Sequence, residues 1–153
     1  MRANMSPGTL FAVGLGLLVM SACVSQTIDP PVVKKAVAPS YPLIAVASRV
    51  TAKLVFDVSI DQQGKVTDAQ LSEVPPFLFR EPYYEQIARR WEFAPDERLN
   101  VRKARIQFDF RLMPLGTPRE QLGTIFLAPY QIEVSAEEPE TVIFTDPKER
   151  PVR

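Results

Sequence analysis

Few side chains of this sequence could carry out catalytic chemistry. The chain has no histidine and a single cysteine, Cys23, so neither a serine–histidine nor a cysteine–histidine pair can form. Metal sites lose their commonest ligand for the same reason. The acids Asp57 and Asp109 alternate outward on predicted strands, and Glu137 and Glu138 lie in a charged C-terminal region, where carboxylates are normally solvated. We therefore expect a protein that is not an enzyme and holds neither a metal nor an organic cofactor.

Residues 1–22 have the pattern of an export signal. Arg2 precedes an apolar run at 10–20, and the small residues Ser21 and Ala22 end it. An apolar helix of this length spans about 17 Å, against a hydrocarbon core of about 30 Å, which favours a signal peptide over a membrane-spanning helix.

Cys23 stands where the small residues end, a position that suits lipid attachment. The run 19–23 resembles a bacterial lipobox, in which the cysteine thiol carries diacylglycerol and becomes the first mature residue. Val24 follows in place of an aspartate, which by resemblance to Gram-negative lipoproteins favours the outer membrane. We expect a lipid-anchored protein on the periplasmic face of that membrane.

Residues 23–38 are predicted to be a tether. Pro30, Pro31 and the following Pro39 interrupt regular structure there. A fully extended chain from Cys23 to the start of the folded part at Tyr41 reaches at most about 65 Å. The folded part is therefore expected to stay close to its own membrane.

Two predicted strands follow and form a hairpin. Residues 50–60 alternate between apolar and polar side chains, and Phe56 belongs to the apolar face. Residues 61–64 (DQQG) suit a tight turn, which predicts an antiparallel return along 65–73. The alternation of that second strand changes phase, so we expect a β-bulge near Thr67.

Residues 83–95 contain an amphipathic helix. Its apolar residues recur at the helical spacing i, i+3, i+4 and i+7, and comprise Tyr84, Ile87, Ala88 and Trp91. Pro82 suits the first helical position, where an N–H group is not needed. We expect the helix to lie on a sheet, with Trp91 as a core residue rather than a ligand-stacking one.

Residues 101–112 form the strongest predicted strand. Its outer row is polar and typical of an exposed surface or a guarded edge, and consists of Arg105, Gln107, Asp109 and Arg111. Its inner row is apolar. The predicted structural core comprises Phe56, Trp91, Phe93, Phe108 and Phe110. Together the elements predict an α+β fold, a small antiparallel sheet with one packed helix in the order β-β-α-β.

The same residues resemble a known family. Residues 39–42 (PSYP), the turn residues Gly64-Lys65-Val66, the run 88–95 (ARRWEFAP) and the strand end 108–110 (FDF) are similar, in order and spacing, to the TonB C-terminal domain family. The resemblance covers residues 39–112.

The resemblance implies binding rather than catalysis. TonB pairs this domain with an extended peptide of outer-membrane receptors, as an added strand held by main-chain hydrogen bonds. In this chain that role would fall to the edge formed by Arg105, Gln107, Asp109 and Arg111. The tether is too short to bridge the envelope, so we expect an interaction module displayed by a lipoprotein rather than an energy transducer.

Residues 113–153 are predicted to be extra strands and a partly disordered tail. Residues 124–126, 132–134 and 141–145 could add short strands, while prolines keep each piece short. From about Ser135 onward the composition suits either disorder or a partner-binding strand.

Three functions are compatible with the sequence. The first is binding of an envelope protein segment by strand addition, and the second is a structural or assembly factor that acts through its tail. The third is a small-ligand or peptidoglycan-associated binder, with a pocket lined by Phe77, Phe79 and Trp91. The net charge of zero disfavours nucleic acid as a partner. A homodimer formed by strand exchange is compatible with the sequence.

Overall fold

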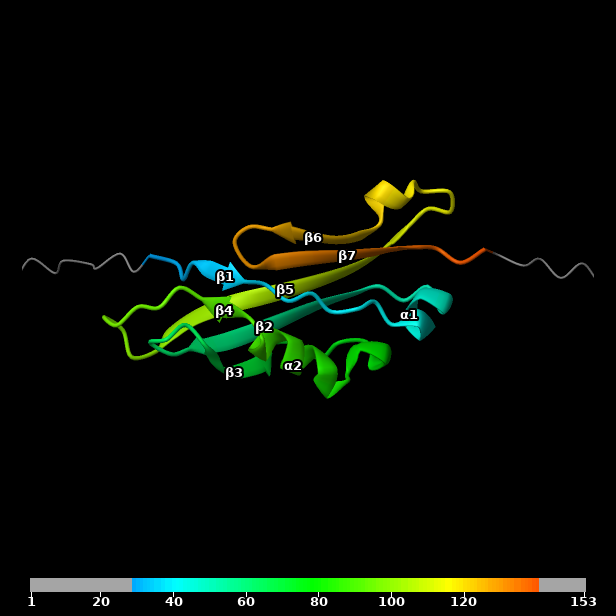
Figure 1. The fold of residues 1–153 in the computed structure, drawn as a ribbon. Helices are drawn as coiled ribbons and strands as arrows, with labels where there is room; N and C mark the ends of the chain where they lie inside the picture. The colour runs from blue at the N-terminus through cyan, green and yellow to red at the C-terminus, as the bar shows by residue number, and fades with distance from the viewer. Residues whose placement is uncertain (1–28, 141–153) are drawn as a thin grey trace, which may run out of the picture.

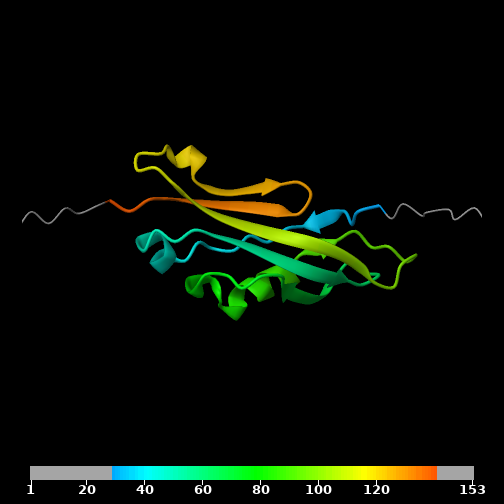
Figure 2. The same cartoon turned by 180° about the vertical axis from the view of Figure 1, so that it is seen from behind.

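A five-stranded sheet with one covered face organises the fold (Figures 1 and 2). The computed structural model describes residues 29–140. The predicted signal peptide, Cys23 and the strand predicted at 141–145 lie outside that range. The strand order is β3-β2-β5-β7-β6, with the bounds Val66–Leu71, Ala52–Ile60, Arg102–Met113, Gln131–Glu137 and Gly123–Leu127.

The other elements are short. A second, two-stranded sheet pairs β1 (Val33–Lys35) with β4 (Glu92–Phe93). The α-helices are α1 (Leu43–Ala47) and α2 (Pro82–Arg89), and single 3-10 turns occupy Phe77–Phe79 and Arg119–Gln121. The protein is therefore an α+β protein dominated by strands, as the alternating sequence patterns predict.

The β2–β3 hairpin has the geometry expected from its sequence. Ser59 pairs with Asp68 and Ile60 with Val66, so Thr67 is the extra residue of a bulge, and the predicted bulge is confirmed. The Asp61 carboxylate accepts a hydrogen bond from the Lys65 N–H at 2.8 Å. Gly64 has φ +85°, and a Cβ there would lie 2.0 Å from the Phe93 carbonyl oxygen, so only glycine fits this turn.

Helix α2 packs its apolar stripe on β2 and β3. Tyr84, Ile87 and Ala88 are buried, and Trp91, just beyond the helix, is fully buried. The helix begins at Pro82, as predicted, and ends at Arg89, just before the last residue of the predicted stripe, Trp91, because Glu92 and Phe93 extend to pair with β1. All five predicted core aromatics are at most 3% exposed: Phe56, Trp91, Phe93, Phe108 and Phe110.

Strand β5 lies in the interior of the sheet. It pairs antiparallel with β2 on one side and parallel with β7 on the other. The prediction that this strand forms an edge is therefore wrong, because the chain's own residues 131–137 take the adjacent place. The predicted antiparallel sheet is correspondingly larger and mixed.

The predicted tether is partly folded. Residues 31–41, here called the N-terminal strap, lie against the domain: β1 pairs with β4, and the Trp91 Nε1–H donates to the Val37 carbonyl at 2.9 Å. The Ala94 N–H donates to the Val32 carbonyl at 2.7 Å. A composition rich in proline suggested a linker, but Val33 and Val37 of the strap pack on the core. Only residues between Cys23 and Asp29 separate the predicted anchor from the described fold.

The predicted tail also contributes to the fold. Ile132 and Val134 on β7 are buried, and Ser135, where disorder was considered, is only 8% exposed. The predicted domain limit after Leu112 falls inside β5, so it does not separate two structural units. No helix within residues 29–140 is both long and apolar enough to cross a lipid bilayer.

Candidate functional site: the two outer edges of the sheet

The four polar residues predicted on β5 lie in a row on the uncovered face of the sheet. Asp109 accepts hydrogen bonds from Gln107 at 3.2 Å and from Gln131 at 3.0 Å. Arg111 forms ion pairs with Glu133 at 3.2 Å and with Asp109 at 3.6 Å. The side chains of Gln107, Asp109 and Arg111 are thus tied to one another and to β7. The backbone pairs with both neighbouring strands from Gln107 to Phe110, whereas Arg105 pairs with β2 alone and Arg111 with β7 alone.

Arg105, at the other end of the row, pairs with Asp57 of β2 at 2.8 Å, and the Ser72 hydroxyl donates to the same carboxylate at 2.7 Å. These contacts hold the pKa of Asp57 below its usual value, with the Arg105 hydrogen bond as the largest cause. A carboxylate that stays ionised and paired is poorly suited to transfer protons.

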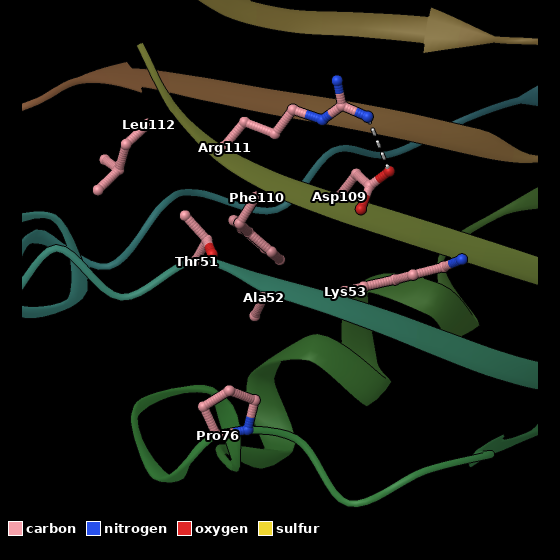
Figure 3. A pocket seen from close by; sticks show the side chains of 8 residues that line it. All are labelled: Thr51, Ala52, Lys53, Pro76, Asp109, Phe110, Arg111 and Leu112. Carbon is pink, nitrogen blue, oxygen red and sulfur yellow. Dashed lines mark ion pairs between the residues drawn. The ribbon is translucent and has the colours of Figure 1, made fainter. Parts of the chain in front are cut away.

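An open depression lies where β2 begins and β5 ends (Figure 3). Figure 3 shows Lys53 and Pro76 on its rim and the ion pair between Asp109 and Arg111 beside it. The depression is broadly open to solvent and carries no nucleophile paired with a base. Within residues 29–140, no cluster of three or more metal-ligating side chains occurs.

The aromatic pocket considered from the sequence does not form around its three named residues. Phe79 and Trp91 are 1% and 0% exposed and fill the core, whereas Phe77 is 79% exposed. Because two of the three side chains are packed and the third points to solvent, they do not line a common cavity. A small-ligand site there loses its support.

The first outer edge is β3, and side chains cover it. One guanidinium nitrogen of Arg89 on α2 donates to the Thr67 carbonyl at 2.8 Å. The other pairs with Asp68 at 3.1 Å and with Glu85 at 2.9 Å. The hydrogen bond that Arg89 donates to the Glu85 carboxylate is the largest cause that raises the pKa of Arg89. The bulge at Thr67 and these charges protect the β3 edge against added strands.

The second outer edge is β6, and no other element of residues 29–140 covers it. All of its residues are exposed, and Ile125, Phe126 and Leu127 are 51%, 46% and 39% exposed. Ile125 lies opposite Glu133, on the uncovered face, whereas Phe126 lies opposite the buried Ile132, on the covered face. An edge strand with apolar side chains on both faces is the type of edge that accepts another strand.

Contacts with the rest of the molecule hold β6 in place. The Phe126 ring centroid lies 6.1 Å from that of Trp91. The Ser135 hydroxyl accepts a hydrogen bond from the Gly123 N–H at 3.1 Å. In the turn that follows β6, the Tyr130 hydroxyl donates to the Pro31 carbonyl of the strap at 2.7 Å. The edge is therefore presented by a fixed hairpin.

Arg102 has a structural role that the sequence did not indicate. Arg102 is only 7% exposed, whereas the adjacent Lys103 is exposed. Its guanidinium donates to the Ala94 carbonyl at 2.7 Å and to the Asp61 carbonyl at 3.4 Å. It thereby links the β2–β3 turn to the segment after β4.

Sequence reasoning missed the importance of β6. Residues 124–126 were expected as a short strand, but its position at the rim of the sheet was not. The available signal was the apolar run Ile125–Leu127 between Gly123 and Pro129, a strand-like piece with no polar face. Comparisons with protein-family models, with curated proteins and with solved structures return no match to this chain, so its site is interpreted from its own geometry.

Proposed function

We propose that this chain is a non-catalytic protein-binding module of the cell envelope. Acyl chains on Cys23 hold it at the periplasmic face of the outer membrane, and an extended segment of an envelope protein binds as an added strand along β6. The observation that carries the proposal is the uncovered apolar edge of β6, with Ile125, Phe126 and Leu127 at least 39% exposed.

Strand addition uses two kinds of contact. Main-chain hydrogen bonds supply affinity, and side chains that alternate along the partner supply selectivity. On one face, Ile125 and Leu127 offer apolar surface beside Glu133 and Gln131. On the other face, Phe126 extends the surface above Trp91. We therefore expect a partner segment of consecutive apolar and β-branched residues, without a polar face.

The resemblance of residues 39–112 to the TonB C-terminal domain family supports binding by strand addition. It does not support β6 as the strand that the partner joins. The edge that the resemblance indicated, on β5, is occupied by β7 from Gln107 to Met113. A partner strand would have to displace β7, and with it the buried Ile132 and Val134. Addition at β6 requires no such displacement.

Site-specific photo-crosslinking in living cells tests the proposal. A photoreactive phenylalanine analogue replaces Ile125 on β6 in the full chain, and the matched control carries it at Thr67 on β3. We expect ultraviolet light to link the β6 variant to an envelope protein through an extended segment, which mass spectrometry identifies. A synthetic peptide of that segment should then protect backbone amides of residues 123–127 from hydrogen exchange.

Equal crosslinking from both positions, or none from β6, would contradict the proposal. A crosslink to a second copy of the chain would assign the edge to self-association instead. Deletion of residues 113–153 does not separate strand addition from an assembly role of the tail. It removes β6 and β7 together and uncovers β5, so point substitutions are required.

A further inference from the structure

We propose that one end of the molecule rests on the surface of the bilayer, so that the strands stand upright from the membrane. The contact surface consists of residues 29–32 and 95–101, here called the membrane-proximal end. The inference rests on the proposed function, because it requires acylated Cys23. It adds an orientation and a lipid-contacting surface to that function.

The length of chain between the anchor and the fold supports this orientation. Asp29 follows Cys23 by six residues, which span about 22 Å at most when fully extended. The strap from Pro31 onward is fixed, since the Pro31 carbonyl accepts from Tyr130 and the Val32 carbonyl from Ala94. The end of the molecule that carries Asp29 therefore cannot move far from the bilayer.

The two ends of the molecule are well separated. Both views place the start of the described chain beside the connection from β4 to β5, and place α1 at the opposite end (Figures 1 and 2). Strand β5 has 12 residues, which corresponds to about 40 Å of extended chain. A six-residue link holds one end at the membrane, and α1 can touch lipid only if the molecule lies flat.

The membrane-proximal end has a surface suited to lipid headgroups. Val32 and Val101 are 66% and 60% exposed, and Pro31, Leu99 and Val101 line one open depression. Charged side chains of both signs are interspersed around it: the exposed Arg98, Lys103, Asp29 and Glu97, and the partly buried Asp96, which pairs with Arg98 at 2.9 Å. Since the charges nearly balance, we expect apolar and headgroup contacts in place of attraction to anionic lipids, and little dependence on salt.

The structure also supplies a matched control for the orientation. Ile44 on α1 is 60% exposed, the same fraction as Val101, but lies at the far end. Because Cys23 is the chain's only cysteine, acylation of Cys23 leaves an introduced cysteine as the single free thiol. A fluorophore can therefore be attached at one end or the other of otherwise identical proteins.

The experiment uses the full-length lipoprotein, expressed with its leader, purified from envelopes and reconstituted in phosphatidylethanolamine–phosphatidylglycerol vesicles. Val101→Cys and Ile44→Cys variants carry the same fluorophore, and lipids with a nitroxide on the headgroup act as quenchers. We expect strong quenching at residue 101 and little at residue 44, at low and at high salt. Circular dichroism checks that both variants are folded, and Val32→Cys should behave as Val101→Cys does.

Mass spectrometry of the same samples separates the outcomes. Unmodified Cys23 would overturn the proposed anchor, and the orientation with it. Acylated Cys23 with equal quenching at residues 101 and 44 would show a flat molecule. Acylated Cys23 with no quenching at residue 101 would show a domain that does not touch lipid. Either of the last two results overturns the orientation and leaves the anchor intact.

Discussion

The β3 and β6 edges of the sheet differ in how their backbones meet solvent. At β3, α2 lies alongside and its Arg89 reaches over the edge to the Thr67 carbonyl and the Asp68 carboxylate. At β6, no helix lies alongside, and the side chains beside the free backbone are apolar. The difference shows that protection of a sheet edge depends on the neighbouring element, and that β6 lacks such a neighbour within residues 29–140.

The largest expected change in stability comes from a substitution in the core between the two edges, and it tests whether both edges depend on that core. Phe108 pairs with Leu54 of β2 and Ile132 of β7 and is fully buried. We expect Phe108→Ala to lower the free energy of unfolding by about 3–5 kcal/mol, measured by urea denaturation. Phe77→Ala, at a residue that is 79% exposed, is the control and should change it by less than about 0.5 kcal/mol.

Hydrogen exchange on the same variants sharpens the result. If β3 and β6 belong to one cooperative unit, Phe108→Ala should accelerate exchange at both edges together. Faster exchange at β6 alone would mean that the β6–β7 hairpin opens independently of the rest. The comparison of the edges would then be one between two units of different stability.

A pH effect is expected on the β3 side. Burial is the main cause that raises the pKa of Tyr84 on α2 to about 12 from its usual 10.0, and the Glu81 carboxylate adds to it. Between these two values the unfolded chain loses the proton while the folded chain keeps it, so stability falls as pH rises through that window. Below it, Tyr84 contributes no pH dependence.

Urea midpoints measured at steps across that alkaline window check this prediction. Tyr84→Phe should reduce the loss of stability, although Tyr41 and Tyr130, whose pKa values are also raised by burial, leave a residual slope. Hydrogen exchange should increase first in α2 and β3. If the stability of Tyr84→Phe fell with pH as steeply as that of wild type, Tyr84 would not be the source of the alkaline pH dependence.

A smaller effect is expected when the covered edge is opened. Arg89→Ala removes two exposed ion pairs and the bond to the Thr67 carbonyl, which should cost about 0.3–1 kcal/mol of stability. Arg90→Ala, at the next exposed position, is the matched control. Amide exchange in residues 66–68 should rise in the first variant only, and equal behaviour of the two would mean that Arg89 does not protect the edge.

The smallest effect on stability is expected when the uncovered edge is given a charge. Ile125→Lys should alter the free energy of unfolding by no more than about 0.5 kcal/mol, because the side chain is half exposed. It should nevertheless abolish strand pairing at β6, since an edge lysine opposes addition. In isothermal titration, the synthetic peptide of the crosslinked partner segment should bind wild type and Thr67→Lys, but not Ile125→Lys. Identical binding by all three would exclude β6 as the contact.

The elements that the sequence predicts well are those set by local patterns. The alternation in 50–60 and 101–112, the glycine turn at 64 and the stripe from Tyr84 to Trp91 each reflect which side of an element is buried. The phase change at Thr67 even located the bulge. These features need no knowledge of which strands lie side by side.

The features that the sequence does not reveal depend on distant partners. A row of polar side chains on β5 indicates that one face of the strand is exposed to solvent. It does not indicate whether another strand pairs with β5 in the plane of the sheet. The acceptor for the buried Trp91 indole is Val37, more than fifty residues earlier. Proline-rich composition obscured the strap, although proline is compatible with extended, packed segments. That β6 lies at the edge of the sheet becomes clear only when β7 is known to lie between β5 and β6.

The parallel pairing of β5 and β7 has a mechanical consequence. The described chain enters at Asp29 at one end of the sheet and leaves near Glu140 at the other (Figure 1). If both ends were held, tension would run along the strands, and the seven β5–β7 residue pairs from Gln107–Gln131 to Met113–Glu137 would bear it together. Under tension between its two ends, these residue pairs would be loaded in shear and would share the force, so the β5–β7 pairing would resist extension of the chain.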